Sequence, residues 1–304
     1  MIKKTLFNDG KASWINIQTD DLDAAAMSKL YKEYDIDDEI LMYSLDKNER
    51  AHIEYNDKSN TLVLIYNVAN INKTDNHYET VPMAFLAKNN SLVTLTNRKN
   101  NYIAERMNDY IFDHEEVSAF KFLFASLFMV SDAFFPLIEE MDTERKLLND
   151  RIRDKTTKQN LFALSDLETG IVYMLSASKQ NAVLLEQLKA HSIFRALDDV
   201  EREQLEDASI EAKQLVEMTN ITSEILSQLS ATYNNVLNNN LNDTMKILTV
   251  LSILLTIPTI ITGFFGMNMP LPLENNPMGW IITIAISVAI WFALSWILNK
   301  VMEK

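Results

Sequence analysis

The stretch TIPTIITGFFGMNMPLPLENNPMGW, residues 256–280, holds three of the five glycines and four of the six prolines in this 304-residue chain. Glycine and proline concentrate where a chain turns. The flanking runs, ILTVLSILLTIPTIITGFFG at 247–266 and WIITIAISVAIWFALSWIL at 280–298, carry no charged residue. Twenty helical residues reach about 30 Å, the thickness of the hydrocarbon core of a bilayer. The stretch therefore predicts a turn between two transmembrane helices, in preference to two helices buried in a soluble core.

The few basic residues near these runs predict an orientation. Lys246 precedes the first run, and Lys300 and Lys304 follow the second, whereas the 267–279 loop has no Lys or Arg. Positive residues gather on the cytoplasmic side. We expect a multi-pass protein of the cell (cytoplasmic) membrane with both termini in the cytoplasm.

A third apolar segment, FLFASLFMVSDAFFPLI at 122–138, contains Asp132 and Pro136 and has charged residues close to both of its ends. An uninterrupted, uncharged run is the usual mark of a span. This segment is therefore interpreted as a buried or helix-packing element.

Composition excludes several functions. The chain has no cysteine, which excludes disulfides and thiol catalysis, and its formal charge of −14 argues against nucleic acid as a partner. An acidic surface suits cations. No Gly-rich phosphate loop or nucleophile motif is present, so we expect neither an enzyme nor an organic cofactor. The histidines lack metal-ligand spacing: His52, His77, His114 and His191.

The N-terminal part predicts an α/β domain with a mixed sheet, over residues 1–115. Runs rich in β-branched and aromatic residues predict strands. They lie at 13–17, 51–56, 60–68, 81–88 and 91–96, and helix-like runs lie at 22–34 and 37–46.

The rest of the chain is predicted to be helical. From 137 to 257 there is one glycine and no proline. A break is expected within 192–204, where Asp198 or Asp199 could cap a new helix. About sixty residues from there would form a helix of about 90 Å, a length usually stabilised by partners, so we expect an oligomer. The predicted segments are a helical region at 116–198, a stalk helix at 199–245, a first span at 246–266, a loop at 267–279, a second span at 280–299 and a tail at 300–304.

One face of the first span is small or polar. At 100° per residue, Ser252, Thr256, Thr259 and Gly263 fall within about 60° of one another. Met245, Leu248 and Thr249 extend this side inward, with Asn242 at its edge. Such a stripe fits close helix packing or the lining of a shared pore, and both readings stay open.

The spans also lack an ionisable side chain, which a proton-coupled carrier usually needs. A neutral pore can pass an ion that keeps its water, and Mg²⁺ dehydrates reluctantly. Six asparagines just before the first span could contact hydrated cations: Asn234, Asn235, Asn238, Asn239, Asn240 and Asn242.

Gly-Met-Asn at 266–268, ending the first of two C-terminal spans, resembles the signature of the CorA family of divalent-cation channels. NDTMKILT at 242–249 and the pair Pro258-Thr259 match the same context. The likeness covers the whole chain in architecture and is residue-specific from about 234 to 280.

This resemblance implies a funnel-shaped homopentamer that conducts Mg²⁺ across the membrane. Each subunit would contribute an α/β cytoplasmic domain, a long stalk helix continuing into the pore-lining span, and a peripheral second span. Asn268, supported by Gly266 and Met267, would form the outer selectivity ring. Asn242 would stand at the inner mouth, and Met245 and Leu248 at the hydrophobic gate.

The resemblance further implies regulatory Mg²⁺ sites between subunits. Mg²⁺ would favour the closed state there because it binds that state more tightly than the open one. Here they would use Asp207 on the stalk and Asp46 on a neighbouring α/β domain.

Three positions depart from the family pattern. Phe265 replaces a tyrosine, Thr256 replaces a bulky apolar gate residue, and Glu274 is the only acid in the outer loop. These changes bear on the width of the gate and on the preferred ion.

Two other functions remain as alternatives. One is a Zn²⁺, Co²⁺ or Ni²⁺ carrier of the same superfamily, with or without proton coupling. The other is a membrane-anchored coiled-coil sensor that transports nothing, although an anchor needs neither a polar stripe nor Gly-Met-Asn.

Overall fold

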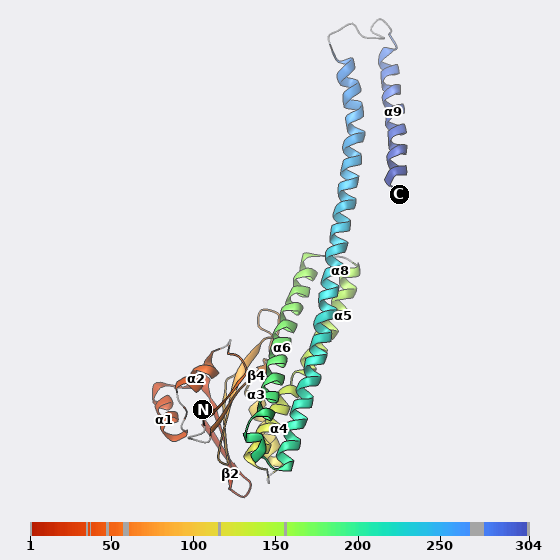
Figure 1. The fold of residues 1–304 in the computed structure, drawn as a ribbon. Helices are drawn as coiled ribbons and strands as arrows, with labels where there is room; N and C mark the ends of the chain where they lie inside the picture. The colour runs from red at the N-terminus through yellow and green to blue at the C-terminus, as the bar shows by residue number, and fades with distance from the viewer. Residues whose placement is uncertain are drawn as a thin grey trace. The chain divides into compact units, whose positions relative to one another are not determined.

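The computed structural model describes residues 2–34, 36, 38–46, 49–56, 61–114, 117–154, 157–267 and 277–302 (Figure 1). The chain divides into two compact units, residues 1–230 and 231–304. The first unit holds a β-sheet and most of the helices. The second holds the C-terminal part of one long helix and a final helix.

The sheet has six strands in the order β1-β2-β6-β5-β4-β3. β2 and β6 are parallel, and every other neighbouring pair is antiparallel. The mixed sheet expected from the sequence is therefore confirmed. The strands are β1 Ile2–Phe7, β2 Ala12–Gln18, β3 His52–Asn56, β4 Thr61–Ala69, β5 Thr80–Lys88 and β6 Ser91–Thr96.

Nine α-helices are assigned within the described ranges. They are α1 Ala24–Tyr34, α2 Asp38–Leu45, α3 Asn101–Asp113, α4 Ala119–Asp132, α5 Phe135–Asp154, α6 Lys158–Ala190, α7 Ile193–Ala196, α8 Asp199–Phe265 and α9 Gly279–Met302.

Helices cover both faces of the sheet, which is why its central strands read as continuous apolar runs. Every residue of β4 is buried. On one face, Leu30 of α1 and Ile40 of α2 pack on the odd-numbered residues of β2 and β4. On the other face, Trp14 meets Phe122 of α4 edge to face, with ring centroids 5.6 Å apart. Figure 1 shows α1 and α2 on the opposite side of the sheet from α4 and α6.

The long helix predicted to run into the first span is also confirmed. α8 has 67 residues, a length of about 100 Å at 1.5 Å per residue. Pro258 lies inside it. Proline has no N–H, so the carbonyl of Leu254 loses its usual helical partner there.

Two features are absent from the sequence-based assignment. Residues 2–7 form edge strand β1, which joins β2 through a turn where Asn8, Asp9 and Gly10 have positive φ. The region after 137 also breaks earlier than predicted, because α5 ends at Asp154 and Thr157 caps α6 by accepting a hydrogen bond from the Asn160 N–H.

α8 begins with a capping box, at the aspartates where the sequence predicts a new helix. The Asp198 carboxylate accepts from the Glu201 N–H at 2.8 Å, and Glu201 accepts from the Asp198 N–H at 3.1 Å. Glu201 also accepts from the Ser118 hydroxyl at 2.5 Å. Because Ser118 is itself the N-cap of α4, one carboxylate joins the starts of two helices.

Glu201→Ala should lower the thermal stability of the full-length protein. It removes two hydrogen bonds from a side chain that is only 9% exposed, a loss of about 1–2 kcal/mol. For a unit of this size, the apparent Tm should fall by about 4 °C. Glu203→Ala removes an exposed acid from the same turn and serves as the control. Equal Tm values for the two variants would contradict this role of Glu201.

Candidate functional site

The apolar parts of α8 and α9 are exposed along nearly their whole length. In the most apolar window of each helix, 6% of α8 and none of α9 is buried within the chain, with mean hydropathy of 2.2 and 2.4. Such surfaces require a bilayer or other apolar partners. The helical stretch 119–154 is also long and apolar enough to span, but 67% of its window is buried within the protein. This burial agrees with the interpretation of 122–138 as an internal packing element.

One face of α8 in the second unit turns toward α9. The half-buried residues of α8 recur every three or four positions: Val250, Leu254, Ile257, Pro258, Ile261 and Phe265. Those of α9 do the same, beginning with buried Gly279 and continuing through Ile282, Thr283, Ser287, Trp291, Leu294, Ser295 and Leu298. The spacing is that of two helices facing one another along a single side.

The polar stripe lies on the other side of α8. At 100° per residue, Ser252, Thr256, Thr259 and Gly263 are centred about 180° from the half-buried face. All four are exposed, as are the residues that extend the stripe inward: Asn242, Met245, Leu248 and Thr249. Packing between α8 and α9 of one chain therefore does not account for the stripe.

The hydroxyls of the stripe donate their protons back to the helix. Thr249, Ser252 and Thr256 donate to carbonyls four residues earlier, each at 2.8 Å. Thr259 donates to the Leu255 carbonyl at 3.0 Å. With the proton committed, each oxygen offers only lone pairs to its surroundings. The stripe is thus a row of hydrogen-bond acceptors, which matches the water molecules around a cation, because these present their hydrogens outward.

No contact within its own chain explains why residue 263 is glycine. A Cβ built on it would meet no atom within 4 Å. Gly266 differs, because a Cβ there would lie 3.1 Å from the Thr262 carbonyl oxygen, which also accepts from the Gly266 N–H at 2.9 Å. Gly266 and Met267 follow Phe265, the last residue of α8, and the predicted ring residue Asn268 lies outside the described residues.

The acids proposed for regulation both lie on exposed surface of the first unit. Asp207 is exposed on α8, and Asp46 is exposed just after α2. No group of three or more His, Asp or Glu suited to hold a metal occurs among the residues that the structure describes. Because the resemblance places Asp46 and Asp207 on neighbouring subunits, their pairing stays a prediction.

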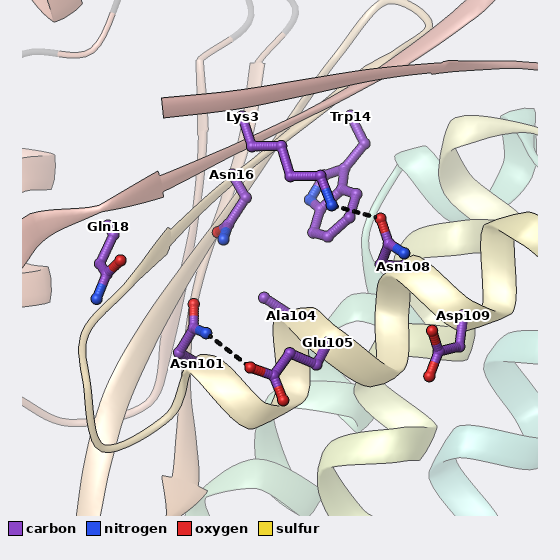
Figure 2. A pocket seen from close by; sticks show the side chains of 9 residues that line it. All are labelled: Lys3, Trp14, Asn16, Gln18, Asn101, Ala104, Glu105, Asn108 and Asp109. Atoms are coloured by element: carbon purple, nitrogen blue, oxygen red, sulfur yellow. Dashed lines mark hydrogen bonds between the residues drawn. The ribbon is translucent and has the colours of Figure 1, made fainter. Parts of the chain in front are cut away.

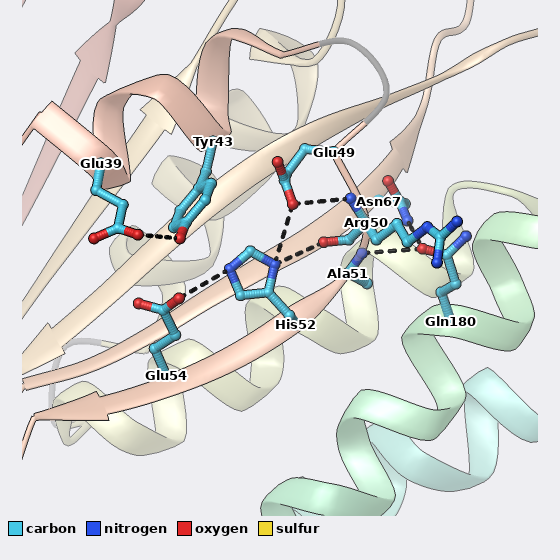
Figure 3. Close-up of polar contacts among 9 residues, drawn as sticks. All are labelled: Glu39, Tyr43, Glu49, Arg50, Ala51, His52, Glu54, Asn67 and Gln180. Carbon is cyan, nitrogen blue, oxygen red and sulfur yellow. Dashed lines mark hydrogen bonds and ion pairs between the residues drawn. The ribbon is translucent and has the colours of Figure 1, made fainter.

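A polar cluster missed by the sequence analysis joins α2 to β3 (Figure 3). His52 Nδ1 lies 2.8 Å from the Arg50 carbonyl, and its Nε2 lies 3.6 Å from the Glu54 carboxylate. The Tyr43 hydroxyl donates to Glu39 at 2.7 Å, and this bond, with some burial and the nearby Glu54 charge, raises the pKa of Tyr43. The strand spacing of His52 and Glu54 places them on one face and could have indicated part of this cluster.

Comparisons with known proteins agree with this architecture. A family model described as CorA-like Mg²⁺ transporter protein matches residues 9–300. The cobalt/magnesium transport protein CorA of Methanocaldococcus jannaschii is 25% identical over 97% of this chain and 92% of its own length.

Solved structures show the same fold. The complete CorA magnesium transporter of M. jannaschii superposes with a TM-score of 0.80 at 24% identity, over 96% of this chain and 92% of that one. The full-length CmaX protein superposes with a TM-score of 0.67 at 14% identity, over 94% and 89%. With a family match over nearly the whole length, the chain belongs to the CorA-like Mg²⁺ transporter family.

Proposed function

We propose that this chain is the subunit of a channel that carries hydrated Mg²⁺ across the cell membrane. The observation that carries the proposal is the acceptor row on α8, on the side away from α9. Hydrated Mg²⁺ holds its water tightly, so oxygen acceptors that contact the hydration shell suit it better than direct ligands do. Family membership supports divalent-cation transport over a sensor or an enzyme.

The proposed assembly is a homopentamer in which α8 of each subunit lines the pore and α9 faces lipid. The outward-facing stripe supports this arrangement, since a pore needs several copies of one polar face turned toward a common axis. Both termini would lie in the cytoplasm, on the side of Lys246 and Lys300. Asn242 would stand at the inner mouth, followed by Met245 and Leu248 at the gate.

Intracellular Mg²⁺ would regulate the channel through Asp207 and Asp46. Mg²⁺ bound between subunits would favour the closed state only as far as its affinity differs between the two states. The exposure of both carboxylates supports this role, because each is accessible to a neighbouring copy.

The stripe can be tested by Mg²⁺ influx into proteoliposomes. The double variant Thr256→Val/Thr259→Val keeps side-chain shape but removes two acceptors from each subunit. A loss of about 1.4 kcal/mol of ion stabilisation corresponds to an influx about tenfold slower.

Thr262→Val is the matched control. Its hydroxyl also donates to a carbonyl four residues earlier, at 2.8 Å, but it lies off the stripe. Equal influx in the double variant and the control would overturn the pore-lining role. An influx that requires a pH gradient would instead favour a proton-coupled carrier, and the absence of flux for any divalent ion would favour a sensor.

A further inference from the structure

A cavity opens between the sheet edge and α3, in the first unit. Its volume is about 260 Å³. Lys3 of β1 and Trp14 and Asn16 of β2 line the sheet side, and Glu105 and Asp109 lie on the α3 side (Figure 2). Neither the ion pathway nor the predicted regulatory acids use these residues.

Asn16 presents an amide donor to this cavity. The Trp14 indole can only donate, and it donates to the Thr94 hydroxyl at 3.0 Å. Thr94 in turn donates to Asn16 Oδ1 at 2.8 Å, and Thr96 donates to the same oxygen at 3.1 Å. These bonds fix the amide oxygen toward β6 and leave Nδ2 on the cavity side.

This donor is open to the cavity. Asn16 is only 9% exposed, and among the described residues its hydrogen bonds use Oδ1 and leave Nδ2 unbonded. Nearly buried polar groups in folded proteins are normally hydrogen-bonded. Water in the cavity can bond this donor, and an acceptor on a bound ligand would take the place of that water.

Lys3 supplies a positive charge on the same side. Its ammonium donates to the neutral amide oxygen of Asn108 at 2.8 Å, which uses one of its three protons. Among the described residues, no carboxylate lies within ion-pair distance of Lys3. Its charge and its remaining protons are available to a bound acidic group.

The helix side carries the opposite charge. Glu105 and Asp109 stand one turn apart on α3, and both are exposed at the cavity. A simple anion would be attracted by Lys3 but repelled by the two carboxylates. A simple cation would be attracted by the carboxylates but repelled by Lys3. A molecule with an acidic group at one end and an ammonium group at the other complements both sides.

We propose that this cavity binds a small zwitterion of the amino-acid class. Its carboxylate would accept hydrogen bonds from Lys3 and Asn16, and its ammonium group would face Glu105 and Asp109. The buried Trp14 ring would contact its apolar part. The cavity volume suits a ligand of this size and is below the range typical of drug-sized ligands.

Calorimetric titration of the full-length protein in detergent tests this proposal. The probes are the twenty L-amino acids, added singly, with acetate and methylamine as probes that carry one charge each. We expect at least one amino acid to bind, and both single-charge probes to bind at least about tenfold more weakly, since each loses one end of the recognition.

Three variants locate the site. Lys3→Met, Asn16→Asp and Asp109→Asn should each weaken binding about tenfold or more. Asn16→Asp keeps an oxygen for Thr94 and Thr96, removes the donor and adds a negative charge that would repel the ligand's carboxylate. Lys4→Met is the control, because it removes the same charge from the next residue of β1, whose side chain points to the other face of the sheet.

Three results would overturn the proposal. The first is that no amino acid binds. The second is that binding is unchanged in Lys3→Met and Asp109→Asn. The third is that acetate or methylamine binds as tightly as the best amino acid. Lys3 and Asp109 are exposed, so their variants should fold. The test therefore remains decisive even if the Asn16→Asp variant does not fold.

Discussion

Asn268→Ala should reduce Mg²⁺ influx into proteoliposomes by about tenfold or more while the oligomer stays intact. In the proposed channel, one amide from each subunit would contact the hydration shell of the entering ion. Alanine removes that amide from every subunit at once and leaves the ion without its first polar partner. Influx would be followed with a Mg²⁺-sensitive dye inside the vesicles, and the oligomer by its elution volume in detergent.

Asn275→Ala is the matched control, because it removes the same group from the same predicted loop. We expect its influx to stay within about twofold of the unmodified protein, since surface amides away from a binding site contribute little. Normal influx in Asn268→Ala, or an equal loss in both variants, would show that Asn268 is not the selectivity element.

The large features of this fold were predictable because they depend on local patterns. An uncharged run of about twenty residues has few stable environments besides a bilayer, and a stretch without glycine or proline has little to interrupt a helix. Asp198 could be identified as a cap because the N-terminus of a helix needs acceptors close in sequence. The stripe on α8 follows from helical periodicity in the same way.

Features that depend on tertiary contacts were missed. β1 carries two adjacent lysines, Lys3 and Lys4, as edge strands often carry charge, and it was identified only through its pairing with β2. The cavity joins Lys3 to Asn108 across 105 positions of sequence, and no local pattern predicts that contact. Similarly, the sequence left the stripe open to two readings, and the position of α9 on the opposite face of α8 was needed to favour a pore.

Gly263→Leu should stop most Mg²⁺ influx without destabilising the subunit. The site has room within its own chain, because an added Cβ meets nothing within 4 Å. Leucine also favours a helix over glycine by roughly 0.8–1 kcal/mol, so the helix itself should gain stability. A fall in influx would then have to come from the space between subunits, where several leucines would narrow the proposed pore at one level.

Two further variants make the result specific. Thr262→Leu places the same side chain one position earlier, about 100° away around the helix and off the stripe, and should conduct almost normally. Gly263→Ala should fall between the unmodified protein and Gly263→Leu if side-chain size is what matters. The helix content of each variant is checked by circular dichroism. If Gly263→Leu conducts as well as Thr262→Leu, then this face of α8 does not line the ion path, and packing between subunits would remain as the reason for its small residues.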